Sequence, residues 1–195
     1  MAAYIFDNIL LKGIRQGQVP ARTADARDWF RDAAKDTRVQ PNKLIEKNRS
    51  KIVARPEVGN MYLFNYDAKH KAKLPYFDKF PLIFKIEDYD DGFLGLNLHY
   101  LPPRLRAKLM DALYDLTTDN RYDDKTRLRV SYNLLNAAAK YKEFRPCVKR
   151  YLNSQIRSRF LEIDSVEWDI ALFLPLARFN ASMSKVYADS RKMLR

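Results

Sequence analysis

In the middle of the chain, apolar blocks alternate with turn signals, and this pattern predicts three β-strands. The strands are expected over 61–66, 81–86 and 93–100, with a polar, lysine-rich loop after the first and an acidic turn after the second. Short connections between successive strands favour an antiparallel meander. Gly95, inside the third strand, predicts a bulge or a close approach of another backbone.

The second half of the chain has helical patterns that provide a cover for such a sheet. Pro102 and Pro103 suit the first turn of a helix, and apolar residues then recur at helical spacing. These apolar residues are Leu105, Leu109, Ala112, Leu113 and Leu116. Further helices are predicted over 125–141, 147–152, 165–173 and 182–194, and a fourth strand over 156–163. The predicted fold is therefore α+β: a small antiparallel β meander, or a partly open barrel, covered by helices.

Residues 1–56 are predicted to form a basic helical arm, and residues 57–195 a single α+β domain. Within that domain, the β-core is expected at 60–101 and the helical layer at 102–195.

The arm has two predicted helices with few apolar residues. The first ends at Gly13 or Gly17, and the second is capped by Thr23 and runs from about Ala24 to Thr37. Each buries little by itself, so we expect its apolar side chains to contact a neighbour or another subunit. These candidate partner-binding residues are Ile5, Ile9, Leu10, Trp29 and Phe30.

The net charge of +12 is distributed unevenly. Residues 1–59 have 12 basic and 7 acidic side chains, and residues 102–195 have 19 and 11, whereas residues 60–101 have 5 and 6. The predicted β-core is thus nearly neutral and its flanks are basic. Basic flanks favour a polyanion or an acidic protein surface as partner, although a solvated basic face has the same composition. We interpret the core aromatics Tyr76, Phe77, Phe80, Phe84 and Phe93 as packing residues.

The chain has a single cysteine, so it has no internal disulfide, which fits assembly in a reducing cytoplasm. No apolar run approaches the roughly 20 residues that span a bilayer, and we expect neither a signal peptide nor a membrane partner.

Side chains that perform enzyme chemistry are few. His70 lies in a lysine-rich loop and His99 at the end of a predicted strand, which favours a solvated and a structural histidine, respectively. Two histidines without a close acidic partner predict no metal site, and Cys147 on an apolar helix face predicts an inert thiol. We therefore expect no enzyme activity, no catalytic residues, no metal and no cofactor.

Residues 140–159 combine seven basic residues with one acid and three interleaved aromatic residues, Tyr141, Phe144 and Tyr151. Phosphate contacts and stacking on exposed bases are one interpretation of this mixture. The others are a solvated face over core tyrosines and a contact with an acidic neighbouring subunit. The candidate nucleic-acid-binding residues are Lys140, Lys142, Arg145, Lys149, Arg150, Arg157 and Arg159.

One long string, NMYLFNYDAKHKAKLPYFDKFPLIFKIEDYDDGFLGLNLHY over residues 60–100, is distinctive. It is followed by LPPR at 101–104, FRPC at 144–147, IRSRF at 156–160, EWDIALFLP at 167–175 and YADSR at 187–191. On these residues the chain resembles the DNA end protector, or head-completion, family of T-even-like contractile-tailed bacteriophages. The resemblance spans most of the chain and is looser over the arm.

The resemblance implies a late structural protein of the virion, assembled in the host cytoplasm and present in several copies. Its partners would be other virion proteins and the ends of the genome DNA. No catalytic motif of the family transfers to this sequence. Two functions follow: protection of packaged DNA ends or completion of the head through DNA contacts, and assembly of a neck, tail or baseplate through protein contacts alone.

Overall fold

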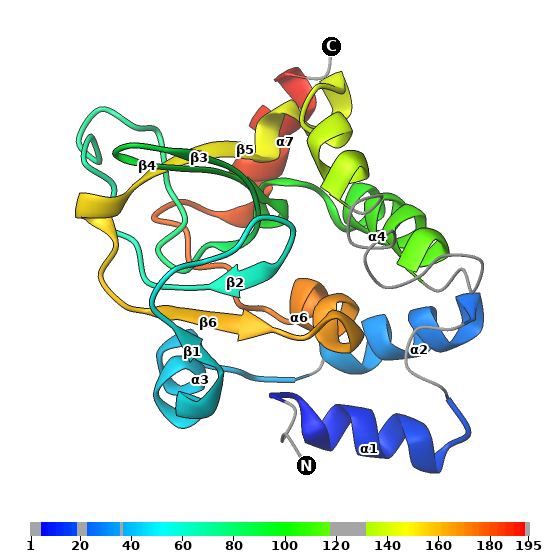
Figure 1. Cartoon of the computed structure of the whole chain (residues 1–195). Helices are drawn as coiled ribbons and strands as arrows, with labels where there is room; N and C mark the ends of the chain where they lie inside the picture. Colours follow the sequence, from blue (N-terminus) through cyan, green and yellow to red (C-terminus); the bar gives the residue numbers. More distant parts are fainter. Residues whose placement is uncertain (1–4, 19–22, 36, 118–131, 194–195) are drawn as a thin grey trace.

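The computed structural model describes residues 5–18, 23–35, 37–117 and 132–193. These residues form a six-stranded antiparallel sheet with helices packed against it (Figure 1). The strands lie in the order β1-β6-β2-β3-β4-β5, and the sheet is open. Their bounds are β1 Ile52–Val53, β2 Met61–Leu63, β3 Leu82–Tyr89, β4 Gly92–Asn97, β5 Val148–Leu152 and β6 Phe160–Ile163. The predicted α+β class is confirmed.

The predicted meander forms the middle of this sheet, where β2, β3 and β4 pair in chain order. The pairing register shifts between Lys85 and Glu87 on β3, next to the pair formed by Lys85 and Gly95, so β3 has a bulge at this point. A Cβ atom at Gly95 would lie 2.8 Å from the side chain of Ile83. The bulge expected near Gly95 is therefore present, on the neighbouring strand, and the close contact at Gly95 is with a side chain and not with a backbone.

The segment after Pro146 is a strand, so the short helix predicted over 147–152 was wrong. Antiparallel pairing of β5 with β4 places Lys149 opposite Gly95. The alternation of exposed Arg150 with buried Tyr151 is that of a strand, although the apolar spacing also fits one turn of helix. The fourth predicted strand is shorter than expected, because β6 begins at Phe160.

The two faces of the sheet have different cores. Along β2, Met61 and Leu63 belong to the core that the helices cover, whereas Tyr62 belongs to a second cluster together with Phe64. We call these the helix-covered face and the aromatic face. The aromatic cluster also contains Tyr66, Phe77, Phe93, Tyr151 and Phe160.

The helices are α1 Asp7–Arg15, α2 Ala24–Lys35, α3 Pro41–Lys47, α4 Pro103–Thr117, α6 Trp168–Phe173 and α7 Met183–Met193, and residues 132–138 are also helical. Short 3₁₀ turns cover η1 Arg49–Lys51, η2 Leu98–Tyr100, η3 Lys142–Cys147, η4 Asn153–Gln155 and η5 Ser165–Glu167. Of the helix predicted over 125–141, the part before residue 132 lies outside the described residues. None of the helices in the described ranges is long and apolar enough to cross a membrane.

The N-terminal helices pack against each other and against α6 of the same chain (Figure 1). Gly13 allows this approach, because a Cβ atom there would lie 2.5 Å from the ring of Phe30. Thr23 Oγ1 accepts a hydrogen bond from Ala26 N at 3.2 Å, which confirms the predicted cap of α2. The chain leaves α1 through Gly17, whose φ of 76° suits glycine.

Buried polar contacts join these helices to α6. Arg31 donates to Asp169 at 3.1 and 3.2 Å and to Asp111 at 2.7 Å. Glu167 accepts a hydrogen bond from the backbone N–H of Phe6 at 2.6 Å. The division of the chain at residue 56 stays a prediction, and in the structure α1 and α2 share one apolar cluster with the sheet.

Candidate nucleic-acid interface

A cleft opens beside the aromatic face, between β5 and the connection from β2 to β3. Its lining combines Tyr66, Phe77 and Tyr151 of the aromatic cluster with Tyr76 and Tyr100, which pack with the helix-covered cluster. The connection from β2 to β3 runs beside the end of β5 (Figure 1). It is held there by hydrogen bonds from Leu152 N to Tyr66 Oη at 3.4 Å and from Asp67 N to the Gln155 carbonyl at 3.0 Å. We call this space the β5 cleft. It is lined by Tyr66, Ala68, Lys69, His70, Leu74, Tyr76, Phe77, Asp78, Tyr100, Lys149, Arg150, Tyr151 and Leu152.

Aromatic rings form much of the cleft wall. The rings of Tyr76 and Tyr100 are tilted against each other with centroids 6.0 Å apart. Phe179 supports both rings from outside the cleft, at 4.9 Å from Tyr100 and 6.0 Å from Tyr76. Tyr100 is buried, whereas Tyr76 is half-buried and Leu74, on the rim, is exposed. The cleft therefore offers a rigid, largely apolar surface with one accessible ring.

Lys149 places a cation inside this aromatic setting. Its ammonium lies over the ring of Tyr100, 4.2 Å from the centroid, which is a favourable cation–π geometry. Among the described residues it has no carboxylate within ion-pair distance. Burial lowers the pKa of Lys149 below its usual value, because removal from water disfavours the charged form. The half-buried charge of Lys149 is thus compensated by a ring alone.

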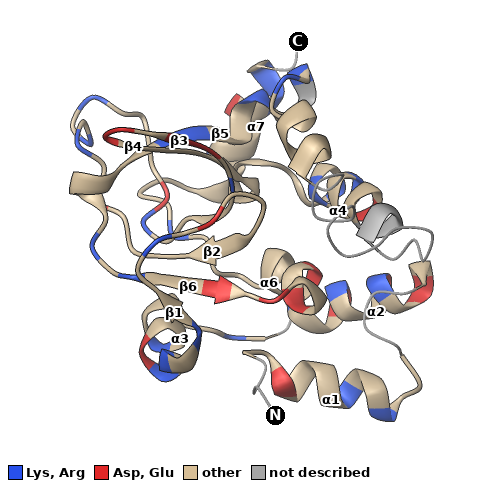
Figure 2. Cartoon of the chain, in the orientation of Figure 1, with Lys and Arg blue, Asp and Glu red and all other residues tan. Residues whose placement is uncertain are grey.

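Further basic residues surround the cleft, and acidic side chains neutralise some of them. Arg150 pairs with Asp91 and stacks on the ring of Tyr89, whose centroid is 4.0 Å away. Arg157 lies 3.9 Å from Asp67, which also pairs with Lys71. Figure 2 shows the basic residues of the β2–β3 connection and of β5 on the same side of the molecule.

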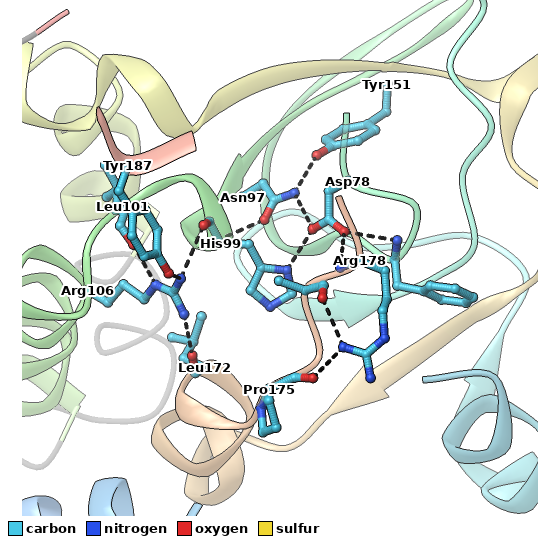
Figure 3. A network of polar contacts seen from close by, with 12 residues as sticks. Asp78, Asn97, His99, Leu101, Arg106, Tyr151, Leu172, Pro175, Arg178 and Tyr187 are labelled. Carbon is cyan, nitrogen blue, oxygen red and sulfur yellow. Dashed lines mark hydrogen bonds and ion pairs between the residues drawn. The ribbon is translucent and has the colours of Figure 1, made fainter. Parts of the chain in front are cut away.

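A buried polar network lies beneath the cleft and holds its walls (Figure 3). Asp78 accepts hydrogen bonds from His99 Nδ1 at 2.6 Å and from Asn97 Nδ2 at 3.1 Å. Its other oxygen accepts from the backbone N–H groups of Phe80 and Arg178, each at 3.1 Å. Asp78 therefore ties the β2–β3 connection to the end of β4 and to the segment before α7.

The network reaches the floor of the cleft and the helices. Asn97 Nδ2 also lies 3.2 Å from Tyr151 Oη, next to the cation-bearing part of β5. On the other side, buried Arg106 donates to the carbonyl groups of His99, Leu101 and Leu172 and to Tyr187 Oη (Figure 3). These hydrogen bonds hold the residues beneath the cleft in place, although His99 Nε2 is buried without a hydrogen-bond partner among the described residues.

Ionised Asp78 is favoured in this setting. Burial opposes its ionisation, but the electrostatic interaction with His99 and hydrogen bonds from His99, Asn97 and the Arg178 N–H outweigh that penalty. The pKa of Asp78 is therefore below its usual value. Both oxygens of the Asp78 carboxylate accept hydrogen bonds from the protein, so Asp78 has a structural role beneath the cleft.

Comparison with family models finds a match to the phage T4 terminal DNA protecting protein over residues 6–194. The chain belongs to this family. Comparison with curated proteins and with solved structures finds no match. The family membership confirms the resemblance inferred from the sequence and makes this a bacteriophage protein of the DNA end protector type.

In this member of the family, the seven predicted nucleic-acid-binding residues fall into three groups. Lys140, Lys142 and Arg145 lie around η3, Lys149 and Arg150 on β5, and Arg157 and Arg159 in the connection to β6. The structure brings the second group to the β5 cleft, and Arg157 to the adjoining Asp67. Their role in binding nucleic acid stays a prediction.

The three interleaved aromatic residues of this segment have different surroundings. Tyr151 is 4% exposed inside the aromatic cluster, and Phe144 packs partly buried against the helix-covered core. Tyr141 is 60% exposed. Of the three, only Tyr141 has an open ring face, while Tyr151 supports the cleft from within.

The predicted partner-binding residues lie against the chain's own core. Leu10 and Phe30 are buried there, and Ile5, Ile9 and Trp29 pack partly buried on the same cluster. The apolar surface that suggested another subunit is thus largely covered by α2, α6 and the sheet. A contact between these residues and a partner stays a prediction, and the exposed apolar residues of α1 are instead Leu11 and Ile14.

The remaining chemical candidates are placed as follows. His99 is fully buried and bonded to Asp78, as the structural interpretation predicted, and His70 is exposed on the cleft rim. Burial raises the pKa of the Cys147 thiol to about 12, which makes it unreactive. The described ranges contain no cluster of three metal-ligating side chains.

The sequence reasoning missed the β5 cleft itself. Tyr76 was assigned to packing alone, and Tyr66, Tyr100 and Lys69 were not assigned to any site. One signal was available, since Tyr66 and Tyr76 flank the lysine-rich loop in the sequence. The arrangement of aromatic residues around a basic loop is typical of surfaces that bind exposed bases.

Proposed function

We propose that this protein binds the ends of the phage genome and protects them from degradation. The observation that carries the proposal is the match over residues 6–194 to the family of the phage T4 terminal DNA protecting protein. We further propose that the protein acts in the virion or the infected cell, alongside other virion proteins, and without catalysis of its own.

The charge distribution supports contact with DNA. Basic residues from two segments far apart in the sequence, the β2–β3 connection and β5, meet at one edge of the sheet (Figure 2). Lys69, Lys73 and Arg159 are exposed and have no ion-pair partner among the described residues. Cations that acidic neighbours do not neutralise remain available for phosphate oxygens.

A nuclease protection assay tests the proposal. Linear duplex DNA is incubated with the purified full-length protein and then with an exonuclease that starts at open ends. We expect the protein to slow degradation at low salt and to lose this effect as salt rises, by about 0.9 log unit of affinity per log unit of salt for each phosphate contacted. Unprotected linear DNA and no measurable binding at low salt would refute the proposed function.

Variants that remove single positive charges test whether the basic residues near the cleft contact DNA phosphates. Replacing Lys69 and Arg159 by glutamine should reduce both the affinity and the salt slope, because each lost phosphate contact removes about 0.9 from that slope. Lys12→Gln is the matched control, since Lys12 is exposed on α1, away from the cleft (Figure 1). Equal effects of all three substitutions would show that the binding surface lies elsewhere.

A second candidate function is assembly of a neck, tail or baseplate through protein contacts alone. It is favoured by the outer face of α1, where Leu11 and Ile14 are 50% and 55% exposed. Deletion of the first 55 residues is unsuitable as a test, because Leu10 and Phe30 belong to the core. The variant Leu11→Ser with Ile14→Ser should instead abolish particle incorporation while leaving DNA binding intact; normal incorporation would count against this candidate.

A further inference from the structure

We propose that the β5 cleft captures one unpaired terminal nucleotide of a DNA end, with its base against Tyr76 and its phosphate near Lys149. This inference rests on the proposed function and adds the site and the chemical feature that it recognises. The ligand class is a single nucleotide at an open strand terminus, not duplex DNA in general.

The size of the cleft suits one nucleotide. It encloses about 310 Å³, which lies at the lower end of the range of about 300–1,000 Å³ for small-molecule sites. A double helix is far too wide for such a space, and a single base with its sugar is not. The cleft thus selects for a nucleotide that has separated from its partner strand.

The walls offer a stacking surface for the base. Tyr76 is half-buried, so part of its ring remains open to the cleft, and Tyr100 and Phe179 hold that ring in place at centroid distances of 6.0 Å each. Leu74, 43% exposed on the rim, extends the apolar surface next to this ring. Stacking on a fixed aromatic ring is tolerant of base identity, because every base has a π-face.

The charge inside the cleft matches a phosphate. The ammonium of Lys149 is half-buried and lies over the ring of Tyr100. A phosphate placed beside this ammonium would form a strong ion pair, because the site is partly shielded from water. Lys69 and Arg150 lie on the same rim and extend the positive surface towards the next phosphates. The one carboxylate of the lining, Asp78, is 2% exposed and is satisfied by its own network.

Capture of a base explains how ends are distinguished from internal DNA. Moving an internal base out of the stack costs a few kcal/mol for unpairing and unstacking. A terminal nucleotide on an overhang avoids most of this cost. A site that accepts a single unpaired base therefore prefers ends without reading any sequence.

A fluorescence experiment tests the inference. The probe is 2-aminopurine, a base analogue whose emission falls on stacking, placed at the terminus of a 3′ overhang, at the terminus of a 5′ overhang, or in the middle of a duplex closed by hairpins at both ends. Full-length protein should quench at least one terminal probe and leave the internal probe unchanged. Equal responses of terminal and internal probes would overturn the inference.

Variants of Tyr76 test whether the quenching of the terminal probe arises in the β5 cleft. Tyr76→Ala should weaken binding to overhang DNA by about fivefold or more and abolish the terminal quenching, because one base–aromatic stack is lost. Tyr76→Phe should retain both. Tyr141→Ala is the matched control, since Tyr141 is an exposed aromatic residue of the basic segment that lies outside the cleft, and it should behave as the wild type.

A variant that removes the charge of Lys149 tests the phosphate contact independently of the stacking contact. Lys149→Gln should reduce the affinity for overhang DNA, whereas Lys12→Gln should not; circular dichroism confirms that each variant is folded. If wild-type protein binds linear DNA but Tyr76→Ala and Lys149→Gln bind it equally well, the cleft inference fails and the proposed function stands. If the wild type binds no linear DNA, the proposed function itself fails.

Discussion

The helix-covered face and the aromatic face belong to one sheet but differ in what covers them. On the first, side chains such as Leu96 and Leu161 are fully buried under helices. On the second, the connection from β2 to β3 provides part of the cover and leaves the β5 cleft beside it. The first face has the properties of a closed core, and the second combines a core with an open site.

The two faces also differ in how they use buried charge. Near the helix-covered face, Arg31 is bonded to two carboxylates from other helices. On the aromatic face, Lys149 has a ring in place of an acidic partner. A half-buried charge without a counter-charge costs stability, which favours our proposal that Lys149 serves a ligand.

The largest expected effect on stability concerns Asp78, whose carboxylate lies beneath the cleft. Asp78→Ala should lower the free energy of unfolding by about 3–5 kcal/mol, because it leaves a buried histidine, an amide and two backbone N–H groups without their acceptor. Denaturant unfolding measures this loss. Asp91→Ala, at an exposed carboxylate, should cost less than about 1 kcal/mol, and equal losses would show that the network does not hold the aromatic face.

The next largest effect is a pH dependence of the free energy of unfolding, which we expect from Glu167 near the helix-covered face. Burial raises the pKa of Glu167 to about 7, so the folded state holds a proton that the unfolded state releases near its ordinary pKa of 4.5. The resulting stability is complete below about pH 4.5 and is lost as the pH rises through about 7.

Comparison with Glu167→Gln isolates this contribution, because glutamine imitates the protonated acid. The variant should match the wild type at pH 4.5 and exceed its free energy of unfolding by up to about 3 kcal/mol at pH 8. A difference that does not change with pH would contradict the assignment.

The packing of the N-terminal helices provides a smaller test. Gly13→Val should lower the free energy of unfolding by about 1–3 kcal/mol, because its Cβ would lie 2.5 Å from the ring of Phe30. Asn8→Val is the control on the exposed side of the same helix. If the two substitutions cost the same, α1 is not part of the helix-covered core.

The smallest effect on stability should accompany a large loss of function. Lys149→Met replaces a half-buried cation by an apolar side chain of similar length and should leave the free energy of unfolding unchanged or raise it by about 1 kcal/mol. The same variant should bind DNA ends more weakly. A clear loss of stability would place Lys149 among the structural residues, like those of the helix-covered face.

The sequence predicted the central meander because turn signals and apolar alternation agree there. It failed at β5, where the apolar residues Val148, Tyr151 and Leu152 fit a helical turn as well as a strand. Pairing with β4 decides between the two, and no local pattern records that pairing. The predicted cover of helices is present, but α1 and α2 contribute to it from within the same chain.

The sequence predicted the basic residues of the candidate site but not the cleft in which they lie. The basic character of residues 140–159 is local and was recognised, and it made Lys149 and Arg150 candidate nucleic-acid-binding residues, which the structure places in the lining of the β5 cleft. The cleft depends on Tyr76 lying near Lys149, more than 70 positions away in the sequence. The strand order puts β5 at an edge of the sheet, beside β4. Long-range contacts, such as the hydrogen bond from Leu152 N to Tyr66 Oη, then bring the β2–β3 connection to β5.

Photo-crosslinking tests most directly the claim that the aromatic face, at the β5 cleft, is the DNA-end site. A linear duplex with 4-thiothymidine as its terminal nucleotide is bound to the full-length protein, irradiated and digested, and the crosslinked peptides are identified by mass spectrometry. We predict crosslinks within residues 66–77 and 149–152, the two segments that contribute most of the cleft lining. Crosslinks confined to α1, α3 or residues 140–145, with none in those two segments, would contradict it.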